Sequence, residues 1–377
     1  MSDKLTRGLE GIIAVETSIC DLDGESGRLA YRGYDVPDMA RKGVTYEEII
    51  YLLLNDELPN RVALKSFSAE LTTERNLPRE LLRMIKLIPP GTHRMAALRG
   101  AVGMLGLFDP EAEDTSPEGN RRKAVRLIAR MPVIAAAIHR TARGEKPLSP
   151  RKGLGHAANF LYMVFGEKPD KQDVRALDAS LVLYAEHENN ASTFTGRVVA
   201  STLSDIYSAV TAAIGSLKGP LHGGAGLAVM DTLEEIGDAK NADSFLEKAL
   251  ADKRLLMGFG HRVYHRSGDP RAAILMNMAR ETCRRRGAEK WFDIAHALDQ
   301  GVQIRKGIIP NVDFYSAPLW RGLGLPPSLF IPVITVSRVA GWCANILEQQ
   351  EKNRLIRPRA SYIGASNRAY KSLRGRP

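Results

Sequence analysis

The sequence predicts a mostly α-helical protein, and three observations support that prediction. The chain of 377 residues is rich in Ala, Leu, Arg and Glu, which favour helices, whereas aromatic residues make up only 6%. Few segments alternate apolar and polar residues with the period of two that marks a half-buried strand. Hydrophobic residues make up 44% and charged residues 25%, which is typical of a globular chain. A chain of this length can bury the core of one large or two medium domains.

Only the N-terminal part of the chain contains strand candidates. Segments 12–17 and 28–31 are short and apolar, and we expect them to pair as a hairpin around residues 23–25. Helical periodicity, broken by Gly, Pro and capping signals, predicts most of the other elements. The predicted helices span 45–54, which opens with a capping box at Thr45 and Glu48, and 131–141, 174–186, 197–218, 227–236, 244–252, 270–286 and 290–305. We expect 111–122 and 307–325 to be irregular.

Two apolar segments, 198–217 and 329–347, resemble membrane spans by their length. The first contains six Ser and Thr residues, and the second carries Arg338, which is costly inside a bilayer. We interpret both as buried helices of a soluble protein and predict no membrane partner. The N-terminus lacks a secretory signal, and three scattered cysteines form neither a disulfide framework nor a four-cysteine zinc site. A cytoplasmic location is therefore expected.

The net charge of +10 is concentrated at the C-terminus. Residues 352–377 contain eight Lys and Arg residues and no Asp or Glu. Such a tail can bind nucleic acid, coat an anionic membrane, close over a polyanionic small molecule, or simply be a solvated terminus.

Several common catalytic motifs are missing. The sequence has no G-x-x-x-x-G-K-[ST] loop and no G-x-S-x-G elbow, and the glycines at 258 and 260 begin a dinucleotide fingerprint that is not completed. His261 and His265 have the i, i+4 spacing of zinc ligands, but Arg262 stands where a metalloprotease has Glu. We therefore predict no metal site.

Two histidines and one carboxylate are the main candidates for chemistry. His222 lies in a glycine-rich turn after an apolar helix, and His261 follows two glycines, so a ligand has room to approach the backbone. Asp313 lies between apolar residues, where burial would raise its pKa and make it a usable base. Each has a simpler alternative: the histidines can belong to plain helix connections, and Asp313 can cap a helix.

Three more residues can contact an anion. Arg338, in an apolar helix, needs either an internal Asp or Glu or a bound carboxylate. Arg271 opens a helix and either faces the same site or lies on the surface, and His187 either joins the site or stabilises a helix C-terminus. Arginine binds carboxylates with two hydrogen bonds. The combined set favours carbon-acid chemistry on an anionic substrate without a metal.

Four segments resemble motifs of the citrate synthase family, in the family's order and nearly from end to end. They are Gly8–Asp38, Tyr184–Gly224, Gly258–Arg271 and Asn311–Ser316. The resemblance is to the short type without an additional N-terminal regulatory domain. It implies an all-α two-domain fold, with a large domain at 1–223 and 325–377 and a small domain at 224–324, and a homodimer.

The resemblance also implies a role for each candidate residue. His222, in GPLHGG, matches the histidine that hydrogen-bonds the acetyl-CoA thioester carbonyl. Asp313, in NVDFYS, matches the base that removes the methyl proton, and His261, in GFGHRVY, matches the acid that polarises the oxaloacetate ketone. The other matches are His187, Arg271 and Arg338 for oxaloacetate, Arg357 for the neighbouring subunit's site, and, as weaker candidates for CoA, Arg266 and Lys306. Acetyl-CoA is then a substrate, and no cofactor is implied.

The predicted function is that of citrate synthase, an acyltransferase that condenses acetyl-CoA with oxaloacetate and hydrolyses the citryl thioester to citrate and CoA. The alternative is 2-methylcitrate synthase, which would use propionyl-CoA with the same residues, since one methylene is worth only about 1–3 kcal/mol in a pocket. A remote alternative is a non-catalytic basic protein that binds nucleic acid, for which His222, His261 and Asp313 would be incidental. We expect no nucleic-acid partner.

Overall fold

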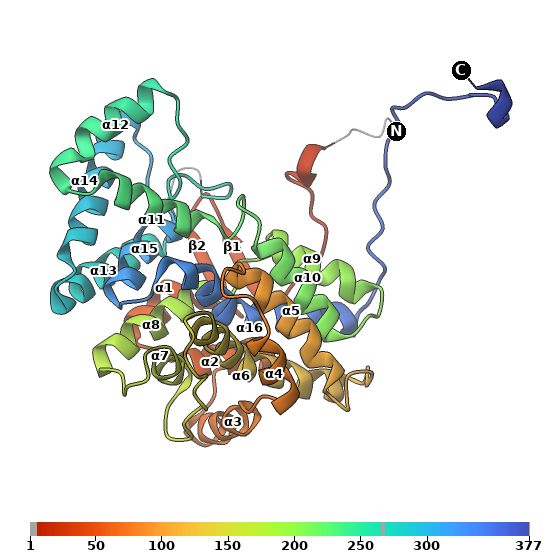
Figure 1. The fold of residues 1–377 in the computed structure, drawn as a ribbon, viewed down its shortest axis with the longest axis horizontal. Coiled ribbons are helices and arrows are strands. Elements are labelled where there is room, and N and C mark those ends of the chain that lie inside the picture. The colour runs from red at the N-terminus through yellow and green to blue at the C-terminus, as the bar shows by residue number, and fades with distance from the viewer. Residues whose placement is uncertain (1–5, 265–267, 377) are drawn as a thin grey trace.

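The computed structural model describes residues 6–264 and 268–376, in which α-helices predominate (Figure 1). The helices are α1 Val36–Lys42, α2 Tyr46–Asn55, α3 Arg61–Glu74, α4 Arg79–Lys86, α5 Arg94–Leu107, α6 Pro117–Ala142, α7 His156–Phe165, α8 Lys171–Tyr184, α9 Ala191–Ser201, α10 Ile206–Leu217, α11 Ala225–Ile236, α12 Ala242–Ala251, α13 Ala272–Arg286, α14 Glu289–Lys306, α15 Val312–Gly322 and α16 Phe330–Glu351. The predicted all-α class is confirmed.

The small sheet near the N-terminus differs in part from the prediction. Its strands β1 Cys20–Asp23, β2 Arg28–Tyr31 and β3 Tyr34–Asp35 are antiparallel in the order β1-β2-β3. The predicted strand at 28–31 is confirmed, but the prediction for 12–17 is wrong. Ile13 is 91% exposed, so the apolar residues of that segment face away from the protein's own core. Cys20 pairs with Tyr31, and both side chains are buried.

Three predicted segments are corrected, each by the residue at which a helix begins. The segment 197–218 is not one helix, because α9 ends and Asp205 then caps α10, accepting a hydrogen bond from the Ser208 amide at 2.9 Å. The segment 307–325 is not irregular, because Asn311 caps α15 by accepting from the Asp313 amide at 3.0 Å. In 111–122, α6 begins at Pro117, and proline is favoured in a first helical turn.

Helix α16 lies at the centre of the helical core. It packs against α6, α8, α9, α10 and α2, and Figure 1 shows it among them. The stretch Pro327–Glu351 is long and apolar enough to cross a membrane by length and composition, but its apolar window is wholly buried inside the fold. The prediction of a buried helix over 329–347 is thereby confirmed.

The candidate residues lie on or next to α8, α11, α13, α15 and α16. Helices α11 to α15 pack mainly on one another, with α13 against α15 and α12 against α14. In Figure 1 they form a group coloured from green to blue beside the rest of the helices. Helices α8 and α16 contact members of this group: α8 packs against α13 and α15, and α16 packs against α11. The basic tail extends away from the body.

Candidate active site

Six of the predicted site residues lie close enough to influence one another's charge. They come from the segment after α8, the turn before α11, the segment before α13, the first turn of α15 and the middle of α16. Burial lowers the pKa of His187 well below its usual value, and four positive or ionisable neighbours lower it further: Arg271, His261, Arg338 and His222. Arg271 and Arg338 also act on Asp313. Residues that are distant in sequence therefore form one cluster.

Aromatic contacts join the two histidines nearest the loop before α13. The rings of His187 and His261 lie 5.2 Å apart, and the ring of Tyr264 lies 4.8 Å from that of His261. His187 Nε2 and the Tyr264 hydroxyl are 3.2 Å apart, and the Tyr264 side chain is buried. Since burial keeps His187 neutral, it can contact a substrate carboxylate as a hydrogen-bond donor rather than as a cation.

Hydrogen bonds align the glycine segment before His261 with the segment before Asp313. The Asn311 amide donates to the Gly258 carbonyl at 2.8 Å, and the Asn311 side chain donates to the Gly260 carbonyl at 2.8 Å. Gly258 has φ of +87°, and a Cβ there would lie 2.6 Å from Val229 Cγ2, so no other residue fits. The glycine that the sequence suggested would give a ligand room instead lets two protein segments approach each other.

The hydrogen bonds of His261 define which of its nitrogens carries the proton. Nδ1 accepts from the Val263 amide at 3.0 Å, and the Tyr264 amide lies 3.4 Å from it. A neutral imidazole has one donor and one acceptor nitrogen. His261 therefore carries its proton on Nε2, which can donate a hydrogen bond to a ligand.

His222 occupies a tight turn between α10 and α11. Its amide donates to the Gly219 carbonyl at 3.0 Å, and a Cβ on Gly223 would lie 2.3 Å from the Leu217 carbonyl oxygen, so the turn requires glycine there. His222 Nε2 lies 2.8 Å from Ser192 Oγ. Burial, with a smaller effect of Arg338, lowers the pKa of His222 to about 4, so the ring is neutral at pH 7.

Ser192 has three partners but only one proton. Besides His222, its hydroxyl lies 2.8 Å from Asn190 Oδ1 and accepts from Trp342 Nε1 at 3.1 Å. In this structure Ser192 donates its proton to Asn190 Oδ1, and the hydroxyl has to turn away from Asn190 for that proton to reach His222 Nε2. When it goes to His222 Nε2, the ring carries its own proton on Nδ1 and can donate from that side.

Asp313 lies in the first turn of α15 with a tyrosine as its side-chain partner. The Tyr184 hydroxyl donates to Asp313 Oδ1 at 2.8 Å. Burial raises the pKa of Asp313, whereas the Tyr184 hydrogen bond and the charges of Arg271 and Arg338 oppose the increase. The carboxyl group is thus more basic than an ordinary Asp while a donor still stabilises its charged form.

Arg338 is buried without an ion-pair partner among residues 6–264 and 268–376. Its Nε donates to the Tyr184 carbonyl at 2.7 Å, and no carboxylate of these segments lies within 4.0 Å of it. Burial lowers the pKa of Arg338, and Glu186 is the main charge that opposes this shift. Of the two alternatives that the sequence left open, a direct internal ion pair is not formed among the described residues, and Glu186 acts on Arg338 only from a longer distance. A bound carboxylate would supply the missing charge.

Arg271 differs from Arg338 because it has an internal partner. Its Nε and Nη2 donate to the two carboxylate oxygens of Asp269 at 2.9 and 2.8 Å, and both residues are buried. The expectation of a surface first-turn residue is thereby excluded. The pair leaves Nη1 without a hydrogen bond to the described segments, so Arg271 can still offer one donor to a ligand.

Residues 8–359 match the model of a known family, the citrate synthase C-terminal domain. The chain belongs to the citrate synthase family. It is 46% identical to citrate synthase 2 of Bacillus subtilis, with 97% of each chain covered. It is also 42% identical to the 2-methylcitrate synthase of Mycobacterium tuberculosis, over 97% of this chain and 92% of that protein. The predicted family and its enzyme class, an acyltransferase of the citrate synthase type, are confirmed.

A solved citrate synthase shares the fold over almost the whole length. The enzyme from Thermoplasma acidophilum, solved with carboxymethyl-coenzyme A and oxaloacetate, has a TM-score of 0.93 and 33% identity, with coverage of 99% of this chain and 100% of that chain. The predicted citrate-synthase fold is therefore confirmed at the level of the helix arrangement.

Two predicted contacts of this citrate synthase family member are exposed, and a third cannot be placed. Arg357 is exposed on the C-terminal tail, and Lys306 is exposed at the end of α14. Arg266, like His265, lies outside the described residues. The roles assigned to these three cations remain predictions.

Four supporting residues were not identified from the sequence: Tyr184, Ser192, Tyr264 and Asp269. Only Asp269 carried a local signal, because it lies two residues before Arg271 and can pair with it directly. The partner of Tyr184 is 129 residues away in sequence. Buried aromatic and Ser residues at helix ends look the same in a sequence whether they support a site or only fill the core.

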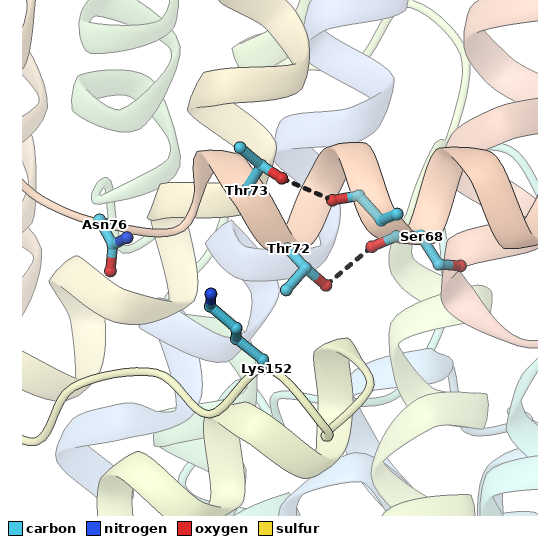
Figure 2. A pocket seen from close by; sticks show the side chains of 6 residues that line it. Ser68, Thr72, Thr73, Asn76 and Lys152 are labelled. Atoms are coloured by element: carbon cyan, nitrogen blue, oxygen red, sulfur yellow. Dashed lines mark hydrogen bonds between the residues drawn. The ribbon is translucent and has the colours of Figure 1, made fainter.

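A separate surface cavity of about 480 Å³ contains none of the site residues. Figure 2 shows it beside α3, where Lys152 points toward the opening. The hydroxyls of Thr72 and Thr73 donate to the Ser68 and Ala69 carbonyls of their own helix. The volume of a cavity does not by itself indicate a reaction or a ligand, and we assign this cavity no role.

Proposed function

We propose that this chain condenses acetyl-CoA with oxaloacetate and hydrolyses the citryl thioester to citrate and CoA. The observation that carries the proposal is the buried guanidinium of Arg338, which has no ion-pair partner among the described residues and lies beside neutral histidines and a buried carboxylate. A dicarboxylate with a ketone, such as oxaloacetate, supplies the anion that Arg338 lacks and a carbonyl for a histidine to polarise. The complex named for the Thermoplasma relative holds oxaloacetate together with a CoA derivative.

Asp313 and His222 would form the nucleophile together. Asp313 takes a proton from the methyl carbon of acetyl-CoA, and the Nδ1–H of neutral His222 donates to the thioester oxygen as charge develops there. Ser192 supports this step when its single proton goes to His222 Nε2, because that arrangement leaves the donor on Nδ1. A neutral donor yields an enol-like nucleophile and avoids a free enolate.

His261 would activate the second substrate. Its Nε2–H faces away from the backbone amides that occupy Nδ1, and it donates to the oxaloacetate ketone oxygen. The enol carbon then bonds to the ketone carbon, and water cleaves the thioester. His187, Arg271 and Arg338 hold the two carboxylates of oxaloacetate in this scheme.

We also propose a cytoplasmic homodimer with domain closure. Arg357 lies on an exposed tail, so it can reach the site of a second copy. Leu221, next to His222, is 96% exposed, which suits coverage by a partner subunit. The small domain, 224–324, would close over oxaloacetate and exclude water from the enol. Small-angle scattering should report compaction on adding oxaloacetate alone, and an unchanged profile at saturation would contradict closure.

The reaction is tested by following thiol release from acetyl-CoA and from propionyl-CoA, each with and without oxaloacetate. We expect oxaloacetate-dependent release that is faster with acetyl-CoA. A preference for propionyl-CoA would move the assignment to 2-methylcitrate synthase, a name that a relative at 42% identity carries. No release from either thioester would contradict the proposed function.

A further inference from the structure

We propose that Tyr184 is a positioning residue that holds one carboxylate oxygen of Asp313 and leaves the other oxygen for the substrate. The inference rests on the proposed function, in which Asp313 is the base. Tyr184 is the last residue of α8 and is 2% exposed. Its ring lies 5.5 Å from that of Trp320, which belongs to the same helix as Asp313. The tyrosine is therefore fixed against the helix that carries the base.

The hydroxyl of Tyr184 has two acceptors within reach. Asp313 Oδ1 lies at 2.8 Å and Ser316 Oγ at 3.0 Å. Ser316 donates its own proton to the Asp313 carbonyl at 3.0 Å, so toward Tyr184 its oxygen can only accept. An ionised carboxylate is the stronger acceptor, which directs the Tyr184 proton to Asp313 before the reaction.

The second acceptor becomes useful once Asp313 has taken the substrate proton. A neutral carboxyl accepts more weakly, and the Tyr184 hydroxyl can then turn to Ser316 without losing a hydrogen bond. Burial and the nearby Asp313 charge raise the pKa of Tyr184 well above its usual value, so the phenol keeps its proton throughout. Tyr184 thus orients the base and donates no proton to the reaction.

The backbone of Tyr184 also contacts the residue proposed to bind oxaloacetate. Its carbonyl accepts from Arg338 Nε at 2.7 Å. The side chain of Tyr184 thereby supports the base, while the main chain supports the arginine. Replacing the side chain alone separates these two contributions, because the carbonyl remains in place.

The test compares Tyr184→Phe with a matched control, Tyr315→Phe. Tyr315 is a buried tyrosine on α15 whose hydroxyl donates to Asp299 Oδ2 at 2.6 Å, so its replacement removes the same kind of bond away from Asp313. We measure kcat, the KM for oxaloacetate, and the pH dependence of kcat. For Tyr184→Phe we expect kcat to fall about tenfold, the acidic limb to move to higher pH, and the KM to stay unchanged. Tyr315→Phe should leave all three at wild-type values.

Two outcomes would overturn the inference: a wild-type acidic limb in Tyr184→Phe, or the same shift in Tyr315→Phe. Ser316→Ala provides a second variant in case Tyr184→Phe does not fold. Without the alternative acceptor the hydroxyl stays on Asp313, so the acidic limb should move to lower pH, and a shift to higher pH would contradict the proposal. A wild-type enzyme that releases no CoA would instead contradict the proposed function, so the two failures are distinguishable.

Discussion

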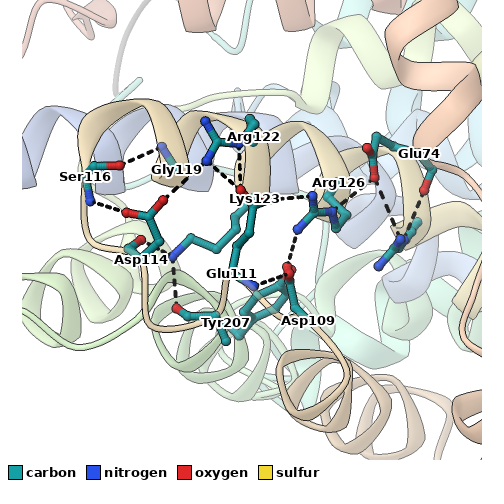
Figure 3. A network of polar contacts seen from close by, with 12 residues as sticks. Glu74, Asp109, Glu111, Asp114, Ser116, Gly119, Arg122, Lys123, Arg126 and Tyr207 are labelled. Atoms are coloured by element: carbon teal, nitrogen blue, oxygen red, sulfur yellow. Dashed lines mark hydrogen bonds and ion pairs between the residues drawn. The ribbon is translucent and has the colours of Figure 1, made fainter.

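Two arginines in this protein, Arg126 in α6 and Arg338 in α16, have opposite surroundings, although Arg126 is partly buried and Arg338 is buried. Arg126 donates to Glu74 at 3.0 Å, to Glu111 at 2.9 Å, and to Asp109. Figure 3 shows this network, in which Asp109 also accepts from the Tyr207 hydroxyl. Within segments 6–264 and 268–376, Arg338 has a single hydrogen bond, to a backbone carbonyl.

The two arginines therefore have different roles: Arg126 belongs to a structural network, and Arg338 belongs to the candidate site. In the Arg126 network each nitrogen of the guanidinium has a carboxylate partner, so the charges are neutralised without a ligand. Around Arg338 two nitrogens have no hydrogen bond to the described residues, and the nearby histidines are neutral. A buried charge left in this state is costly unless a substrate completes it. The predictions below test whether the first region governs stability and the second governs catalysis.

The largest expected effect is on turnover in Asp313→Asn. The amide can still accept from Tyr184 but cannot remove a methyl proton, so kcat should fall by about a hundredfold or more. Oxaloacetate binding, followed by calorimetry, should stay close to wild type. Turnover near the wild-type value would remove Asp313 from the mechanism.

The next effect is on stability in Arg126→Gln. This change leaves the buried Asp109 carboxylate without its cation, and we expect a loss of about 3 kcal/mol in the free energy of unfolding. The kcat of the folded variant should match wild type, because the network lies outside the site. A variant with a lower kcat and an unchanged denaturant midpoint would contradict this prediction, because it would show that the Arg126 network affects catalysis and not stability.

His156 is an exception to this division, because it is buried outside the site and neither of its ring nitrogens has a hydrogen-bond partner in the part of the chain that the structure describes. Burial lowers its pKa to about 3, so the unfolded chain binds more protons between that value and the usual 6.5, and this contribution to stability is lost as the pH falls through that window. His156→Leu should therefore reduce the loss of stability between pH 7 and pH 5 by about 2 kcal/mol. Urea unfolding at the two pH values measures this, and an unchanged pH dependence would show that His156 has the same pKa in the folded protein as in the unfolded chain.

The smallest expected effect concerns Ser192→Ala. Removing the hydroxyl frees His222 Nε2 and lets the ring change tautomer or rotate, so kcat should fall about tenfold, or about 1.4 kcal/mol in the barrier. Thr195→Ala on the same helix is the control, since that hydroxyl donates to the Ala191 carbonyl of its own helix. Equal rates in the two variants would argue against a role for Ser192.

The sequence predicted the helical class and six residues that the fold brings together better than it predicted the residues that support them. The capping box at Thr45 and Glu48 is confirmed, because its signal is local. Asp205 and Asn311 also cap helices but were not recognised, since they stand within apolar or Ser-rich runs. Tyr184 could not be identified, because its role depends on a tertiary contact that periodicity does not encode.

The central claim is that the guanidinium of Arg338 binds a substrate carboxylate. Calorimetric titration with oxaloacetate tests this claim most directly. Wild type, Arg338→Gln and Arg126→Gln are compared at one pH and salt concentration. We predict that Arg126→Gln binds oxaloacetate like wild type and that Arg338→Gln binds it about a hundredfold or more weakly. Equal affinity in wild type and Arg338→Gln would contradict the account.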